Sequence, residues 1–230
     1  MHSSAIFNKA IEWGLPTSTN PAKGIRAFRE KSRDRFLQPD ELRRFFSALD
    51  GEPNSVFRDY ILLSLYLGQR RGNMLAIRWA DIDFTNRRLY IAETKNGEPQ
   101  NVPLPPPALA LLQDMRRQRG GAWVFPSRVL KNDHLKEPRK PWVALLQRAG
   151  IDNLRIHDLR RTLASYQVMT GATLPVIGKT LGQKTPAATS IYARLTLDPV
   201  LDSMTTAIDK MLGFRDSGDN KALPKPADGK

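Results

Sequence analysis

Residues 155–166 read RIHDLRRTLASY and hold one of the three histidines of the chain. His157 and Arg160 are three positions apart, so a helix would carry both side chains on one face. An imidazole can exchange a proton near neutral pH, and a guanidinium stays charged and can bind two oxygens at once. Leu159 and Leu163 would anchor the same helix in a core. The stretch is a candidate oxyanion site, although a lone helical histidine is more often structural.

Three other stretches carry residue types that suit phosphate chemistry. They are YLGQRRGNML with Arg70 and Arg71, ETKNGEPQNV with Lys95 at the tip of a predicted hairpin, and LGQKTPAATSIYARL with Gln183 nine residues before Tyr192. Each alone has an ordinary structural interpretation, because arginines can cap a helix and a tyrosine can pack in a core. Only their combination points to chemistry.

The charge balance favours a polyanionic partner. Lys and Arg total 36 against 23 Asp and Glu, which gives a formal net charge of +13 and a pI near 10.3. Nucleic acid or an anionic membrane would fit, and a generically basic protein is the alternative. The absence of cysteine excludes disulfides, thiol nucleophiles and Cys-bound zinc, and the histidines lack metal-ligand spacing. We therefore expect no metal and no cofactor.

The hydrophobic pattern predicts an α+β fold that is mainly α, with a small three-stranded antiparallel sheet. A helix begins at Pro39 with an apolar stripe, and a more buried helix ends at Gly68. Strand-like pieces at 77–84, 87–93 and 100–105 are separated by turn residues. Helical patterns follow, at 106–119, 140–150, 157–171, 173–182, 185–195 with Thr185 as N-cap, and 198–214.

Composition divides the chain into three parts. Residues 1–30 contain a short helical pattern and a linker broken by two prolines, and such a helix cannot bury itself. Residues 31–213 hold the main domain. Residues 214–230 are polar, rich in proline and without aromatic side chains beyond Phe214, which predicts a disordered tail. No apolar run approaches the roughly 18 residues of a membrane span, and no signal-peptide pattern is present, so we expect a cytoplasmic location.

Taken in order, the four stretches resemble the tyrosine recombinase (phage integrase) family. The matching residues are Arg70, Lys95, His157, Arg160, Gln183 and Tyr192. The resemblance covers about residues 31–212, the catalytic domain of that family, and residues 1–30 look like the last helix and linker of its core-binding domain. Two residues depart from the pattern: Gln183 stands where the family usually has His or Trp, and Asn73 where it often has an acid. Gln183 can donate an N–H but cannot shuttle a proton.

The resemblance implies a site-specific DNA recombinase that cleaves and rejoins strands through a 3′-phosphotyrosine. Tyr192 would be the nucleophile, and Arg70 and Arg160 would hold the phosphate oxygens. His157 would be the general base or a hydrogen-bonding partner, and Lys95 would protonate the leaving 5′-oxygen. Gln183 would brace a non-bridging oxygen, and no cofactor would be needed.

The implied partner is double-stranded DNA, with no membrane involved and a nucleoid-associated location. Basic side chains would supply affinity for the DNA backbone, and the candidates for DNA contact are Arg33, Arg35, Arg71, Lys140 and Arg161. A homo-oligomer, a tetramer on DNA, is expected, with accessory DNA-bending proteins as further partners. The last helix would dock on a neighbouring protomer or pack on its own domain.

Two alternatives remain open from the sequence. The chain could be a catalytically weak or inactive DNA-binding remnant of an integrase, which Gln183 and the short N-terminal part favour. It could also be a type IB topoisomerase-like enzyme, which shares the tyrosine nucleophile but relaxes supercoiled DNA without sequence preference.

Overall fold

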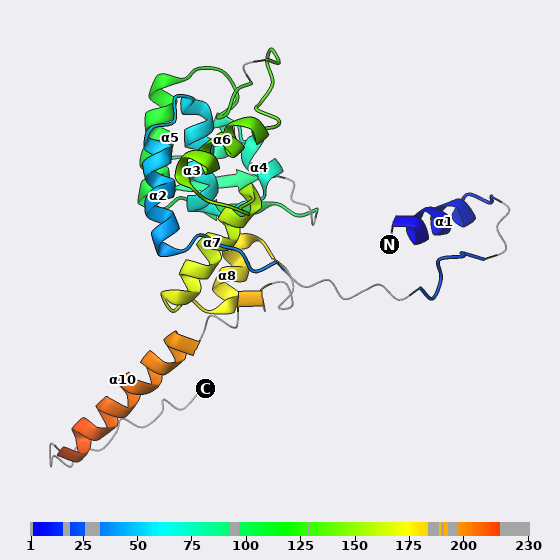
Figure 1. The fold of residues 1–230 in the computed structure, drawn as a ribbon. Helices are drawn as coiled ribbons and strands as arrows, with labels where there is room; N and C mark the ends of the chain where they lie inside the picture. Colours follow the sequence, from blue (N-terminus) through cyan, green and yellow to red (C-terminus); the bar gives the residue numbers. More distant parts are fainter. Residues whose placement is uncertain are drawn as a thin grey trace, which may run out of the picture. The chain divides into compact units, whose positions relative to one another are not determined.

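The computed structural model describes residues 2–15, 19–25, 33–92, 97–127, 129–183, 189, 191–192 and 197–216. The chain divides into two compact units, residues 1–33 and 34–230 (Figure 1). Lys95 and most of the predicted helix over 185–195, with its predicted N-cap Thr185, lie outside the described residues. So do residues 217–230 of the predicted tail.

The first unit is one helix and the loop that folds back on it. Helix α1 covers His2–Glu12. Asn20 is buried, and its amide donates to the carbonyl of Ser4 at 2.9 Å and to Oδ1 of Asn8 at 2.6 Å. Ile6 and Trp13 are 67% and 70% exposed. The loop therefore holds the helix by polar contacts and leaves its apolar side chains in solvent.

The second unit is mainly helical, and its helices follow the predicted pattern closely. Their bounds are α2 Pro39–Asp50, α3 Ser55–Leu67, α4 Arg71–Leu75, α5 Pro106–Gln118, α6 Arg139–Ala149, α7 Ile156–Met169, α8 Leu174–Leu181 and α10 Leu197–Asp216. Helix α3 begins after Asn54, whose side chain accepts from the backbone N–H of Phe57, and ends at Gly68 with φ +60°. In α2, Phe45 and Leu49 are buried as the stripe predicts.

A three-stranded antiparallel sheet, in the order β1-β2-β3, interrupts the helices, which confirms the predicted fold class. The strands are β1 Ile82–Asp83, β2 Arg88–Ile91 and β3 Gln100–Pro103. Leu89 pairs with Val102, and both are buried. The first strand is much shorter than the predicted 77–84, because Trp79–Asp81 form a 3₁₀ turn, η1, in which the N–H of Asp81 binds the carbonyl of Arg78.

Two hydrophobic clusters hold the second unit together. The larger is built around α3, with Phe57, Tyr60 and Ile61 fully buried. The smaller joins α7 and α8, which lie side by side (Figure 1), and contains Ile177, Leu181 and Tyr192. A predicted nucleophile is thus part of a core. None of the described helices is long and apolar enough to cross a membrane.

Candidate active site

The first turn of α7 carries His157 and Arg160, as the sequence predicts. The helix begins after Arg155, whose backbone N–H donates to the Asp158 carboxylate at 2.8 Å. Asp158 is 1% exposed and also pairs with Arg161, N to O at 3.3 Å. Leu159 is fully buried. Buried contacts on one face therefore fix the helix, and the direction of its polar side chains follows from that.

Arg160 connects three elements from a buried position. Arg160 is only 4% exposed. Its Nη1 donates to the carbonyl of Gly68 at 2.7 Å, and its Nη2 donates to the carbonyl of Leu181 at 2.5 Å. Burial, and then the charge of Arg70, lower the pKa of Arg160 to about 10, and the Tyr192 phenol opposes this shift. Arg160 stays charged at neutral pH. A guanidinium has five N–H donors, so three remain for a substrate.

His157 lies on the solvent side of the same turn. Partial desolvation, followed by the charges of Arg160 and Arg161, lowers the pKa of the imidazole below its usual 6.5. The charge of Arg70 acts in the same direction, and Asp158 opposes it. The ring is therefore neutral at pH 7 and can accept a proton or a hydrogen bond.

Arg70 belongs to the same cluster of charge. It is half-buried at the N-cap of α4, and its charge acts on both Arg160 and His157. Two guanidinium groups so placed repel each other, and each favours an anion between them. The structure thus brings Arg70, His157 and Arg160 together as an electropositive site.

Tyr192 lies against this site but is covered. It is 4% exposed and packs with Ala164, Val168 and Ile177. Burial raises the pKa of its phenol, and the charges of Arg160 and Arg161 oppose that rise. The phenol is therefore protonated at neutral pH in this arrangement.

Gln183 comes directly after the end of α8. Gly182 caps the helix with φ +58°, and the Gln183 backbone N–H donates to the carbonyl of Gly178 at 2.8 Å. Its side-chain oxygen is buried and has no hydrogen-bond partner among the described residues. Unpaired buried acceptors are rare in proteins. This amide is therefore a candidate to bind a group at the site, through its oxygen or, after rotation, through its N–H groups.

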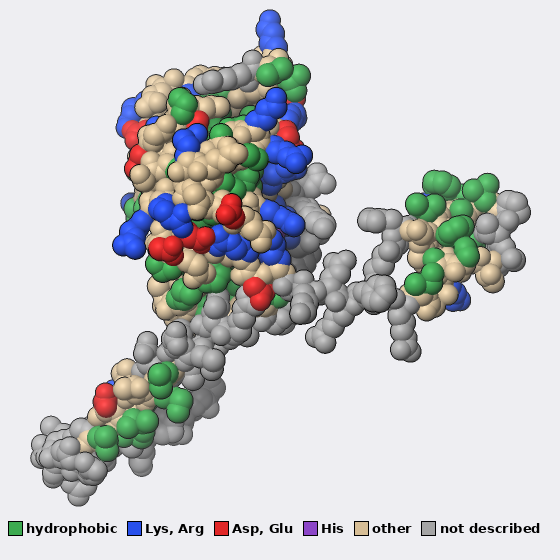
Figure 2. Space-filling view, in the orientation of Figure 1, with side chains coloured by type: hydrophobic (Ala, Val, Ile, Leu, Met, Phe, Trp, Pro, Cys, Tyr) green, Lys and Arg blue, Asp and Glu red, His purple; other side chains and the backbone are tan. Residues whose placement is uncertain are grey.

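The predicted DNA-contact residues lie in different environments. The Arg35 guanidinium makes a two-point ion pair with Glu41, at 2.6 and 2.5 Å, and lowers the pKa of that carboxyl. Arg71 pairs with Glu137 at 3.1 Å on the surface, Arg161 pairs with Asp158, and Lys140 is exposed. Arg33 is half-buried and has interaction partners. Figure 2 shows Lys and Arg side chains spread over one face of the second unit. DNA contact by these residues stays a prediction.

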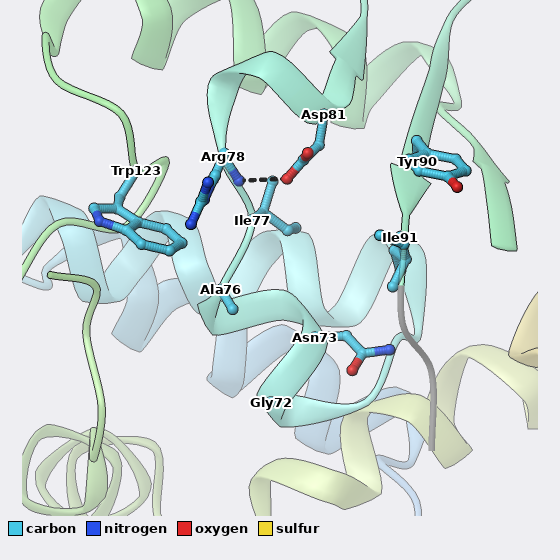
Figure 3. A pocket seen from close by; sticks show the side chains of 10 residues that line it. Gly72, Asn73, Ala76, Ile77, Arg78, Asp81, Tyr90, Ile91 and Trp123 are labelled. Carbon is cyan, nitrogen blue, oxygen red and sulfur yellow. Dashed lines mark hydrogen bonds between the residues drawn. The ribbon is translucent and has the colours of Figure 1, made fainter. Parts of the chain in front are cut away.

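A pocket of about 460 Å³ between α4 and β2 has no counterpart in the sequence-based expectations (Figure 3). The Arg78 guanidinium lies 4.6 Å from the centre of the Trp123 ring at one end. At the other end Asn73 on α4 lies near Ile91 on β2, and its amide nitrogen is buried without a partner among the described residues. One feature of the sequence drew attention to this pocket: Asn73 stands where the resembled family often has an acidic residue.

Comparison with known proteins gives the family of this chain. Residues 35–198 match the sequence profile described as "Phage integrase family". The chain belongs to the phage integrase family. A shufflon-specific DNA recombinase of Escherichia coli is 34% identical over 165 residues, 70% of this chain and 40% of that protein. The integrase of Salmonella phage P22 is 30% identical over 181 residues, 72% of this chain and 45% of that protein.

Solved structures of integrases share the fold of this family member. The integrase of transposon Tn1549, solved with a circular intermediate DNA, superposes with a TM-score of 0.68 at 16% identity, over 89% of this chain and 76% of that chain. A lambda integrase dimer bound to a COC′ core site gives 0.62 at 23% identity, over 80% and 69%. The chain spans less than half of the length of the two curated relatives named above.

Proposed function

We propose that this chain is the catalytic part of a site-specific DNA recombinase that cleaves and rejoins DNA strands through a 3′-phosphotyrosine. The observation that carries the proposal is the joint placement of Arg70, His157, Arg160 and Tyr192, which share one electrostatic environment although they span residues 70–192. Residues 1–30 would be the last helix and linker of a core-binding domain.

The proposed cleavage step uses the residues as follows. The Tyr192 oxygen attacks the phosphorus, its proton passes to His157, and the bond from phosphorus to the 5′-oxygen breaks. Arg70 and Arg160 offset the negative charge that builds on the non-bridging oxygens, which is the largest expected contribution to the rate. Gln183 donates an N–H to the same phosphate, and Lys95 protonates the leaving 5′-oxygen. A 5′-hydroxyl attacking the phosphotyrosine reverses every step and rejoins a strand without ATP.

The partner in this proposal is double-stranded DNA, contacted by Arg33, Arg35, Arg71, Lys140 and Arg161. The net charge of +13 supports it, since each phosphate contact releases counterions. The proposal includes assembly into a homo-tetramer on DNA, which is supported by exposed apolar side chains on α10 (Figure 2). They are Leu201, Met204 and Ile208, with exposures of 64%, 57% and 45%. Accessory DNA-bending proteins and a nucleoid location belong to the same proposal.

Covalent trapping tests the function. Duplexes that tile the DNA flanking the gene would be nicked at successive positions, so that cleavage releases a short strand and leaves the protein attached. The expected result is a denaturation-resistant adduct with the wild-type chain and none with Tyr192→Phe. Sequencing the attached strand would give the cleavage site. Duplexes that bind in a salt-sensitive way but never become attached would instead establish a DNA-binding remnant, and relaxation of any supercoiled plasmid would indicate a topoisomerase.

A further inference from the structure

The direction of the Arg160 guanidinium depends on two carbonyls from different parts of the chain. Nη1 donates to Gly68, which caps the end of α3, and Nη2 donates to Leu181, the last residue of α8. Because a guanidinium is a rigid planar fork, two such bonds set both its position and its plane. The N–H groups that remain for a phosphate keep their direction only while these two carbonyls keep their separation.

The side chain of Gln69 joins the same two parts of the chain. Gln69 follows Gly68 directly and is 5% exposed. Its Nε2 donates at 2.9 Å to the carbonyl of Thr180, the residue before Leu181. One buried amide therefore links the neighbours of the two carbonyls that Arg160 binds.

The end of α8 needs this bond, because the last carbonyls of a helix have no partners inside the helix. Gln100 Nε2 also lies near the carbonyl of Thr180, but at the longer distance of 3.3 Å. The Gln69 amide is itself held in place, since the same Nε2 donates to the carbonyl of Leu67 at 3.0 Å. Removal of this amide would leave a buried carbonyl with a weaker partner and would loosen the connection beside Arg160.

We propose that Gln69 is a positioning residue for the proposed cleavage, because it fixes the separation of the Gly68 and Leu181 carbonyls and so directs the remaining N–H groups of Arg160. Its backbone also leads directly into Arg70, the second arginine of the site. A misplacement of about 1 Å can cost about two orders of magnitude in rate, so a side chain that does not touch the substrate can still control the reaction. This inference rests on the proposed function.

Gln167 on α7 offers a matched comparison. It is half-buried, and its Nε2 also donates to Thr180, but to the side-chain Oγ1, at 3.2 Å. This bond leaves the backbone carbonyls at the end of α8 untouched. Loss of the Gln167 amide should therefore leave the direction of Arg160 unchanged, whereas loss of the Gln69 amide should alter it.

A double-mutant cycle tests whether Gln69 acts through Arg160. The rate constant for adduct formation is measured on the nicked duplex at saturating protein, where release of the short strand lets slow reactions be followed for hours. We expect Gln69→Met to lower this rate constant about tenfold in the wild-type background, with DNA affinity within about twofold. In the Arg160→Lys background, where no fork spans the two carbonyls, it should lower the rate constant by less than about twofold. Gln167→Met should stay within about twofold in both backgrounds.

A second variant keeps the test independent of folding. The amide of Gln69→Asn is one methylene group short of Thr180, so this variant should repeat the pattern if Gln69→Met does not fold. A smaller folded fraction lowers the concentration of active protein but not the rate constant at saturation. Equal slowing in the two backgrounds, or no slowing in the wild-type background, would overturn the inference. A wild-type chain that forms no adduct would instead overturn the proposed function, and the inference with it.

Discussion

The side chains of the site lie in surroundings that are unfavourable for them, either beside a like charge or away from water. Arg160 is buried beside Arg70, and Tyr192 is buried without ionising. This arrangement lowers the stability of the folded protein, and a bound anion would stabilise it. The sequence predicted which residues meet, because their types and order are distinctive. It could not predict that Tyr192 is covered, since burial depends on how Ala164 and Ile177 pack around it.

Replacement of Arg160 by lysine should separate charge from geometry. Lysine keeps the positive charge but cannot bind the carbonyls of Gly68 and Leu181 and still offer a fork to a phosphate. We expect Arg160→Lys to slow adduct formation by about 100-fold or more while DNA affinity changes by only a few fold. Gel-shift titration and trapping would measure the two effects. Arg117→Lys, at an exposed arginine that pairs with Asp114 on α5, is the control and should lose little activity.

Acid should destabilise the protein through His157. Folding lowers the pKa of this imidazole, so the unfolded chain binds the proton more tightly. The stabilisation is present above about pH 6.5 and is lost as the pH falls through the folded pKa. The melting temperature of His157→Gln should therefore fall less than that of wild type between pH 7.5 and pH 5. Parallel melting curves for the two proteins over this range would contradict the assignment.

At the scale of elements, long amphipathic helices were predictable and short connections were not. The spacing of Leu42, Phe45 and Leu49 was enough to place α2, and Asn54 and Gly68 mark both ends of α3. Helix α4 was missed because its five residues carry no periodic signal. The turn at Trp79–Asp81 replaced a predicted strand because the N–H groups of Asp81 and Ile82 bind the carbonyls of Arg78 and Trp79. The Asp81 carboxylate also accepts from the backbone N–H of Arg78.

A hydroxyl on α7 binds the start of the second unit. Thr162 Oγ1 accepts from the buried backbone N–H of Leu37 at 3.0 Å and donates to the carbonyl of Asp158 at 2.9 Å. Thr162→Val keeps the shape but leaves that N–H unpaired, so we expect a loss of about 1–3 kcal/mol in the free energy of unfolding. Urea denaturation would measure it. Thr170→Val, at the exposed end of the same helix, should change stability by less than about 0.5 kcal/mol.

At the scale of the whole molecule, two surface features stand out: the excess of positive charge and the exposed apolar side chains of α10. The sequence left open whether this last helix docks on a neighbouring protomer or packs on its own domain. The described side chains Met204, Ile208 and Met211 are 57%, 45% and 61% exposed. A contact between two molecules depends on both surfaces, so the sequence of one chain does not predict what covers these side chains.

Charged substitutions on α10 should separate assembly from cleavage. We expect Met204→Glu combined with Ile208→Glu to leave the melting temperature unchanged, because both side chains are already exposed. The same protein should form fewer multi-copy complexes on DNA, which light scattering of the protein–DNA mixture would measure. Thr206→Glu combined with Lys210→Gln, which changes the charge by the same two units at exposed positions of α10, would control for the added charge. Unchanged complexes in the apolar variant would rule out α10 as the contact.

The last carbonyls of α8 accept hydrogen bonds from Gln69, Gln100 and Arg160, and these contacts limit how the length of this chain can vary. Each residue of an α-helix turns the chain by about 100°, so one residue added or removed between Leu174 and Leu181 would rotate its last carbonyls away from Gln69, Gln100 and Arg160 together. Three elements would lose their connection in a single step. Insertions and deletions that survive should therefore fall before Thr173 or after Gln183, and a scan of one-residue deletions across this region should reveal two sharp edges.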